Sequence, residues 1–310
     1  MDIVFMGTPA FALPVLEAAL ALGARVVGVY TRPDKPQGRG LVMEAPPVKE
    51  FALARGLPVF QPPTLRSPAA QAELAALKPD LLLVAAYGRI LPPEALAIPR
   101  KGAINVHPSL LPRYRGVSPV VTALLDGVDV TGVTLYLLDD GMDSGPILAQ
   151  RQEQVQPEDT AESLTLRLFQ LGAEIARDVL PRWLAGDITP QPQDQAAATV
   201  TRPIAREDGE ADWRLPAEAL HRRLRAFTPW PGLYTRWKGR NLKIVDAAPL
   251  SGAAEPGLVV PLDEPGIPCG VGTGEGILGL KALLLEGKKE LPGREFLLGY
   301  RDFVGARLSS

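Results

Sequence analysis

The opening stretch of the chain constrains the fold more than any other part of it. Residues 2–6, DIVFM, form a short apolar run that is typical of a buried strand, and residues 11–23 have the apolar pattern of a helix that ends at a glycine. Residues 25–31, RVVGVYT, are typical of a second strand. A strand, a helix and a second strand in this order predict a parallel sheet with helices packed on its faces.

The same alternation continues up to residue 186. Further strands are expected at 57–62, 80–88, 102–108, 132–140 and 146–155, and further helices at 48–56, 69–77, 119–127 and 158–186. Residues 1–186 are therefore predicted to fold as one α/β domain with a mostly parallel sheet.

The pattern changes beyond residue 186. Residues 187–206 are rich in Pro, Gln and Ala and have no periodicity, so they predict a linker over the surface. A helix is expected at 216–227, and several short strands separated by Gly and Pro follow it. Residues 207–310 are therefore predicted to form a smaller domain built as a β-barrel.

Composition excludes several classes of protein. One cysteine, Cys269, and two histidines cannot form an internal disulfide or a Cys- or His-rich zinc site, and no metal is expected. No uncharged apolar run approaches the roughly 20 residues that span a bilayer. The N-terminus, MDIVFMGTP, lacks the basic segment and long apolar segment of a signal peptide. A cytoplasmic monomer without membrane contact is expected.

The stretch INVHP contains the first candidate for chemistry. Asn105 and His107 are two residues apart at the end of a predicted strand, so their side chains point to the same face. Ligands bind at the carboxyl ends of strands in an open α/β sheet. An asparagine donates a hydrogen bond to a developing oxyanion, and an imidazolium stabilises its charge. The alternative is a histidine that is simply hydrogen-bonded in the core.

A second candidate is the acidic turn DDGMDSGPIL at 139–148. It places Asp139, Asp140 and Asp143 at the end of another predicted strand. A carboxylate near a histidine favours its protonated form. The alternative is a solvated or calcium-binding turn, although the spacing of an EF-hand loop is absent.

Together, GAINVHPSLLPRYRG and DDGMDSGPIL resemble the folate-dependent formyltransferase superfamily. In that superfamily an Asn, a His and a later Asp form the catalytic group, and 10-formyltetrahydrofolate donates the formyl group. The resemblance gives these roles to Asn105, His107 and Asp143. It also implies a Rossmann-like catalytic domain followed by an OB-like β-barrel.

Other motifs extend the resemblance over nearly the whole chain. MGTPAFALPVL, TRPDKPQGRG, VAAYGRILP and AFTPWPG are similar to the branch of the superfamily that formylates the free amino group of initiator methionyl-tRNA for translation initiation. Two stretches depart from that branch. GRGLVMEAPPVK lacks the lysines that members often carry after GRG, and RGVSP replaces the usual RGAAP.

The resemblance implies a folate site along two stretches of the first domain. For the apolar members, plain core packing is the alternative, and the Leu111–Pro112 peptide bond is expected to be cis. The residues expected to contact the folate are Tyr87, Gly88, Ile90, Leu91, Ser109, Leu110, Leu111, Pro112, Leu138 and Asp139.

RNA contacts need positive surface, because phosphates dominate the affinity. Residues 220–243 contain no Asp or Glu and interleave basic with aromatic side chains, which suits RNA binding, whereas a solvated helix face with core tryptophans is the alternative. The loop at 32–40 is expected to be mobile without tRNA and to hold the acceptor end. The residues expected to contact tRNA are Lys35, Arg39, Arg222, Arg223, Arg236 and Lys238.

Two alternatives remain open from the sequence. One keeps the chemistry but transfers the formyl group to an amino sugar or a purine ribonucleotide. The other is an RNA-binding protein with an inactive first domain. The second domain, the PDKPQGRG loop and the basic strip favour tRNA as the acceptor, and the presence of Asn105, His107 and Asp143 favours an enzyme.

Overall fold

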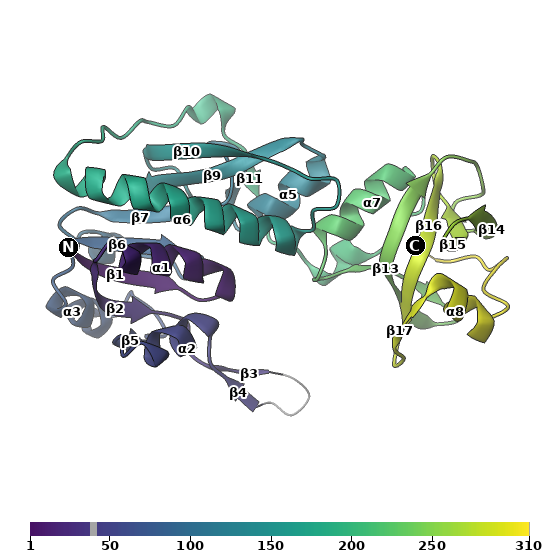
Figure 1. Ribbon diagram of the computed structural model, residues 1–310, viewed down its shortest axis with the longest axis horizontal. Coiled ribbons are helices and arrows are strands. Elements are labelled where there is room, and N and C mark those ends of the chain that lie inside the picture. Colours follow the sequence, from purple (N-terminus) through teal and green to yellow (C-terminus); the bar gives the residue numbers. More distant parts are fainter. Residues whose placement is uncertain (38–41, 310) are drawn as a thin grey trace. The chain divides into compact units, whose positions relative to one another are not determined.

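Alternating strands and helices build a seven-stranded sheet in the computed structural model, which describes residues 1–37 and 42–309 (Figure 1). The sheet order is β10-β9-β7-β6-β1-β2-β5. Its strands are β1 (Asp2–Gly7), β2 (Arg25–Tyr30), β5 (Val59–Phe60), β6 (Leu81–Ala85), β7 (Ala103–His107), β9 (Val130–Leu137) and β10 (Ile147–Gln154). The strands from β7 to β5 are parallel, and β9 and β10 are antiparallel to their neighbours. The mostly parallel sheet is as the sequence predicts.

Helices cover both faces of this sheet. The helices that pack on it are α1 (Leu13–Ala21), α2 (Pro47–Ala54), α3 (Pro68–Ala76), α4 (Pro93–Leu96) and α6 (Ala161–Ala185), whereas most of α5 (Pro119–Asp126) belongs to the second compact unit described below. Buried residues of α1, α2 and α6 pack on one face, and those of α3 and α4 pack on the other. Ile104 and Val106 of β7 belong to the first core. Because side chains alternate along a strand, Asn105 and His107 lie on the opposite face, as predicted.

The order of the strands also marks where a ligand is expected. The chain runs from β1 to β2 and β5 on one side, and then returns to β6 and β7 on the other side of β1. Such a reversal is the switch point at which open α/β sheets bind ligands, beyond the carboxyl ends of the strands. His107 is the last residue of β7, so it lies at this edge.

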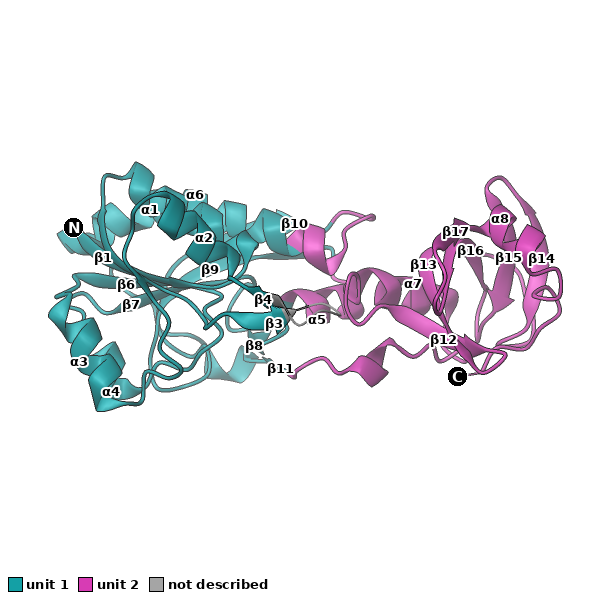
Figure 2. Ribbon diagram, turned by 90° about the horizontal axis from the view of Figure 1, so that it is seen from below, with its two compact units in different colours: residues 1–119, 129–155, 165–201 teal, residues 120–128, 156–164, 202–310 magenta. Residues whose placement is uncertain are grey.

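By contacts, the chain divides into two compact units, which Figure 2 colours separately. The first contains residues 1–119, 129–155 and 165–201, and the second contains residues 120–128, 156–164 and 202–310. Residues 187–201 therefore belong to the first unit. Its short strand β11 (Val200–Thr201) pairs in parallel with β8 (Arg115–Gly116).

The second unit is built on an antiparallel sheet of six strands, in the order β12-β13-β16-β15-β14, with β17 paired to β16. Its elements are α7 (Ala217–Ala226), β12 (Leu233–Trp237), β13 (Arg240–Leu250), β14 (Val259–Glu264), β15 (Ile267–Gly272), β16 (Ile277–Leu285), β17 (Glu290–Pro292) and α8 (Gly293–Gly299). Single bridges join Arg236 to Ser309 and Leu258 to Arg307, so the end of the chain contacts β12 and the residue before β14. Closure into an OB-like barrel stays a prediction.

Several local features differ from the sequence-based expectations or add to them. The sequence did not predict β17 and α8. The stretch expected to be a loop at 32–40 contributes β3 (Lys35–Gln37), which pairs with β4 (Val42–Glu44). The base of this hairpin is tied by Asp34, whose carboxylate accepts hydrogen bonds from Lys49 and Gln61 at 2.7–2.8 Å. The Leu111–Pro112 peptide bond is cis, as expected.

None of the helices in the described part of the chain combines the length and apolar character needed to cross a membrane.

Candidate active site

Asn105 and Asp143 are joined through a residue that the sequence did not identify, Tyr136 of β9. In the antiparallel pairing of β7 with β9, Asn105 is the direct partner of Tyr136. The Asn105 amide nitrogen donates to the Tyr136 hydroxyl at 3.2 Å, and that hydroxyl donates to Asp143 Oδ1 at 2.5 Å. The sheet therefore brings together an amide, a phenol and a carboxylate from positions far apart in the chain.

His107 is the fourth member of this cluster and is only 4% exposed. Its Nε2 lies 2.9 Å from the main-chain oxygen of Tyr114. Because a carbonyl oxygen only accepts hydrogen bonds, Nε2 must carry a hydrogen. The remaining nitrogen, Nδ1, lies 3.7 Å from Asp143 Oδ2. A second ring hydrogen on His107 would therefore have to be on Nδ1, the nitrogen that faces the Asp143 carboxylate.

Asp143 has an unusual backbone that its neighbours hold in place. Its φ is +50°, in the left-handed region that non-glycine residues rarely adopt. The Gly116 amide donates to Asp143 Oδ2 at 2.6 Å. The side-chain nitrogen of Gln193 donates to the main-chain oxygens of Asp143 and Gly145 at 2.9 and 2.7 Å. These contacts fix both the carboxylate and the turn that carries it.

Gln193 is held in turn by Arg115, which is 7% exposed. The Arg115 guanidinium donates to Gln193 Oε1 from Nε at 3.1 Å and from Nη2 at 2.6 Å, and to Gln195 Oε1 at 2.9 Å. Thr199 Oγ1 accepts from the Tyr114 amide at 2.8 Å. The segment 193–201, which the sequence suggested to be part of a linker, thus supports the turns that carry Asp143 and Tyr114.

The Tyr136 hydroxyl stays protonated. Burial raises its pKa well above the ordinary value, and the adjacent Asp143 carboxylate raises it further. Because the group remains a phenol, it donates its single hydrogen to Asp143 and has lone pairs available for Asn105.

The predicted folate residues 109–112 form a turn that is braced from β9 and β10. Ser109 is fully buried, and its Oγ donates to the Arg113 oxygen at 2.7 Å. Thr134 Oγ1 donates to the Ser109 oxygen at 2.6 Å, and Gln150 donates to the Leu111 oxygen at 2.7 Å. Leu111 is 3% exposed, whereas Leu110 and Pro112 are half-buried.

The predicted folate residues 87–91 are a mixed group. Tyr87 is 2% exposed, and burial raises its pKa to about 12. Its main-chain oxygen accepts from Thr8 Oγ1 at 2.9 Å. The Gly88 oxygen accepts from Arg32 at 2.6 Å. Ile90 is 73% exposed and available to a ligand, and Leu91 is half-buried.

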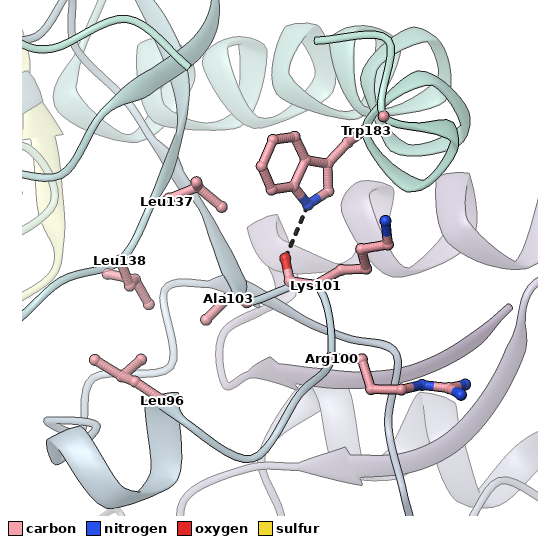
Figure 3. A pocket seen from close by; sticks show the side chains of 9 residues that line it. Leu96, Arg100, Lys101, Ala103, Leu137, Leu138 and Trp183 are labelled. Carbon is pink, nitrogen blue, oxygen red and sulfur yellow. Dashed lines mark hydrogen bonds between the residues drawn. The ribbon is translucent and has the colours of Figure 1, made fainter. Parts of the chain in front are cut away.

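The two remaining predicted folate residues follow β9. Asp139 is exposed, and its carboxylate accepts from Ser144 at 2.9 Å. Leu138 lines a hollow of about 340 Å³, which Figure 3 shows with Leu96, Ala103 and Trp183 around it. Ala103 begins β7 and His107 ends it, so this hollow lies at the other end of the strand from His107. The structure thus places Leu138 apart from His107.

The predicted tRNA residues divide by exposure. Lys35 and Arg236 are exposed, and exposed Lys238 forms an ion pair with Asp302. Arg39 lies outside the described residues.

Two of these arginines are engaged within the second unit. Arg223 is half-buried on α7 and donates to the Asp208 oxygen at 2.6 Å. Arg222 is also half-buried, and its stem packs close to Gly127. Within the described ranges, 1–37 and 42–309, no group of three or more His, Cys, Asp or Glu side chains is placed to hold a metal ion.

Comparison with known proteins identifies the class. Residues 1–180 match the formyl transferase family, and residues 203–301 match the formyl transferase C-terminal domain. The chain therefore belongs to the formyl transferase family.

Similar proteins of known function show which branch of the family the chain resembles. The methionyl-tRNA formyltransferase of Chloroflexus aurantiacus is 48% identical over 96% of this chain and 97% of its own length. That of Roseiflexus sp. (strain RS-1) is 49% identical over 99% of this chain and 95% of its own. The chain thus groups with the methionyl-tRNA formyltransferases.

Solved structures share the fold. The N-formyltransferase from Helicobacter canadensis, in complex with folinic acid and dTDP-3-aminofucose, superposes with a TM-score of 0.67. It covers 90% of this chain and 98% of its own, at 17% identity. At this identity the likeness concerns the fold alone.

Proposed function

We propose that the protein transfers the formyl group of 10-formyltetrahydrofolate to the free amino group of methionine on initiator tRNA. One observation carries the proposal: Asn105, His107 and Asp143 lie in one cluster, in which Tyr136 joins Asn105 to Asp143, and the chain groups with the methionyl-tRNA formyltransferases. We propose further that it works as a cytoplasmic monomer, which light scattering at assay concentration tests for the oligomeric state.

In the proposed mechanism, the methionyl amine attacks the formyl carbon and a new carbon–nitrogen bond forms. The carbonyl oxygen becomes an oxyanion. The second hydrogen on the Asn105 amide nitrogen and a hydrogen on His107 Nδ1 donate to that oxygen. Stabilising such an oxyanion is usually the largest contribution to acyl transfer.

The intermediate then collapses, and the bond from the formyl carbon to N10 of the folate breaks. Asp143 accepts the proton that the attacking amine loses and passes it to N10 as the bond breaks, so that tetrahydrofolate and the formylated amine are the products and Asp143 is again a carboxylate. Until Asp143 accepts that proton, its Oδ2 lies beside His107 Nδ1 as a negatively charged partner.

We propose that the folate lies along residues 87–91 and 109–112, with Asp139 close to it. The braced turn at 109–112 supports this, since it offers fixed main-chain groups next to His107. The exposed side chain of Ile90 offers an apolar contact for the pteridine. Leu138 is the member of the predicted set that this arrangement supports least.

For tRNA, we propose that Lys35, Arg39, Arg236 and Lys238 contact phosphates. The exposure of Lys35, Arg236 and Lys238 supports this proposal. Arg222 and Arg223 act mainly in packing α7, because their side chains are half-buried. Each lost phosphate contact should reduce the salt slope of tRNA binding by about one unit.

The tRNA proposal is tested by a pair of matched double variants. Arg236→Ala with Lys238→Ala should flatten the salt dependence of tRNA affinity. Lys288→Ala with Lys289→Ala removes two exposed charges from the same unit and is the control. Equal slopes in both variants would contradict the proposed contact surface.

The function itself is tested by incubating the protein with 10-formyltetrahydrofolate and charged initiator tRNA, and by measuring formylmethionine. Asn105→Ala and His107→Ala should each lower kcat by about 100-fold to 1000-fold while the protein stays folded. Aminated sugar nucleotides and an amino-bearing purine ribonucleotide are the parallel acceptors. If either one is formylated faster than charged initiator tRNA, that acceptor is the substrate instead. If no acceptor is formylated, the protein is not an enzyme of this type.

A further inference from the structure

We propose that Tyr136 is a positioning residue that determines which atom of the Asn105 amide faces the formyl oxygen. The inference rests on the proposed formyl transfer and adds a residue to it. Tyr136 contacts both Asn105 and Asp143, and its ring lies edge-on to the His107 ring at 6.4 Å between centroids. It is the one side chain of the described cluster that meets all three predicted catalytic residues.

The direction of the hydrogen bonds follows from the number of hydrogens. The Tyr136 hydroxyl has one hydrogen, and the carboxylate of Asp143 at 2.5 Å can only accept it. The hydroxyl must therefore accept from Asn105, and only the nitrogen end of the amide can donate. If the amide turned over, its oxygen and the Asp143 carboxylate would compete for the same hydrogen.

This constraint matters because the two ends of the Asn105 amide act in opposite ways on the substrate. With the nitrogen at Tyr136, the second hydrogen on that nitrogen is free for the developing oxyanion. With the amide reversed, its oxygen would take the place of the nitrogen beside Tyr136 and the formyl oxygen. The amide oxygen would then repel the negative charge of the developing oxyanion. Tyr136 thus selects the catalytic orientation without touching the substrate.

Burial makes the selection strong. Tyr136 is fully buried, so no bulk water reaches the hydroxyl to replace either bond. In such surroundings a hydrogen bond to a charged group is strong, and leaving a polar group unpaired is costly. The reversed amide would leave an acceptor unpaired there, which keeps its population low.

Tyr136→Phe removes the hydroxyl and keeps the ring. We expect kcat to fall by about 10-fold to 100-fold, which is less than the loss on removing an oxyanion donor outright, since Asn105 remains. The KM values for folate and tRNA should stay within about twofold, because uniform binding is untouched. Tyr30→Phe is the matched control, since Tyr30 is also a fully buried tyrosine of the same sheet.

A double-mutant cycle separates positioning from a general structural role. In an Asn105→Ala background, Tyr136→Phe should cost clearly less than in the wild type, because the amide it orients is gone. Single-turnover rates at high enzyme concentration make the slow variants measurable. The same fold-loss in both backgrounds, or a change in KM alone, would overturn the inference.

A measurement on the wild type avoids reliance on the variant's folding. One of the two side-chain amide protons of Asn105 should exchange slowly with solvent, because it is bonded to a buried phenol oxygen. Fast exchange of both protons would overturn the inference. A wild-type protein that forms no formylmethionine would refute the proposed function instead, whereas an active wild type with an equally active Tyr136→Phe variant would refute only the role of Tyr136.

Discussion

Replacing Gln193 by glutamate should lower the catalytic rate more strongly than the stability of the protein, because it displaces the turn that carries Asp143. Gln193 Oε1 accepts two hydrogen bonds from Arg115, and its Nε2 donates to the oxygens of Asp143 and Gly145. Glutamate has the same length and keeps the acceptor for Arg115. It has no hydrogen for the two carbonyl oxygens and presents a negatively charged oxygen to them instead.

The magnitudes follow from these contacts. The buried Gly145 oxygen and the partly buried Asp143 oxygen lose their donor, at about 1–3 kcal/mol for each that is left unpaired. The bonds from the Arg115 guanidinium gain a charged acceptor, and the resulting ion pair offsets part of this loss. We therefore expect Gln193→Glu to lower the unfolding free energy by about 1–3 kcal/mol, or Tm by roughly 3–10 °C in a domain of this size.

The rate should respond more strongly than the stability. Repulsion at both oxygens moves the turn that carries the Asp143 carboxylate, and a misplacement of about 1 Å costs about 100-fold in rate. Gln193→Ala is the comparison. It leaves Nε and Nη2 of buried Arg115 unpaired, so it should be less stable than the glutamate variant and similarly slow.

Thermal unfolding and single-turnover formylation, measured on both variants, test the expected changes in stability and in rate. A Gln193→Glu protein with wild-type turnover would refute the idea that this amide positions Asp143. An alanine variant as stable as the glutamate variant would refute the dependence of Arg115 on Gln193.

Three further predictions follow from the described contacts. A fragment of residues 1–201 should be more stable to heat than one of residues 1–186, because the shorter one lacks the segment that ties the active-site turns; equal Tm values would contradict this. Gly145→Ala should destabilise the protein by several kcal/mol, since the new Cβ would lie 1.8 Å from a main-chain oxygen of β9, and a Tm within 2 °C of wild type would argue against it. A hydrogen bond from Arg202 lowers the pKa of Asp208 from 3.8 to about 2, so this pair stabilises the folded state above pH 3.8 and the contribution is lost as the pH falls toward 2. Arg202→Ala should therefore shift acid unfolding to higher pH in a circular dichroism titration, and an unchanged midpoint would count against the pair.

The sequence predicts local features of the site better than long-range ones. The common orientation of Asn105 and His107 follows from the two-residue period of a strand, and the structure has it. Tyr136 was not predicted, because its role depends on the antiparallel register between β7 and β9, which apolar pattern alone does not specify. Gln193 was not predicted for a similar reason, since it lies in a segment without periodicity and acts through main-chain oxygens.

In the second unit, the sequence likewise did not show which charged side chains are exposed. Sequence pattern placed Arg222 and Arg223 on a basic strip, but it does not show which side of a helix packs inward. On α7 both arginines are half-buried, and Arg223 donates to a main-chain oxygen. The short helix α8 was not predicted, because seven residues bounded by glycines carry too little periodicity to distinguish a helix from a turn.

The hydrogen bond from His107 to the main chain of Tyr114 has an evolutionary consequence. The atom that fixes the tautomer of His107 is a carbonyl oxygen, and every amino acid has one. A substitution at position 114 therefore changes the side chain but cannot delete the acceptor. What selection must preserve there is the left-handed backbone, with φ at +59°, a conformation that glycine and asparagine also adopt readily. Relatives can thus drift at this position while the protonation chemistry of the histidine stays the same.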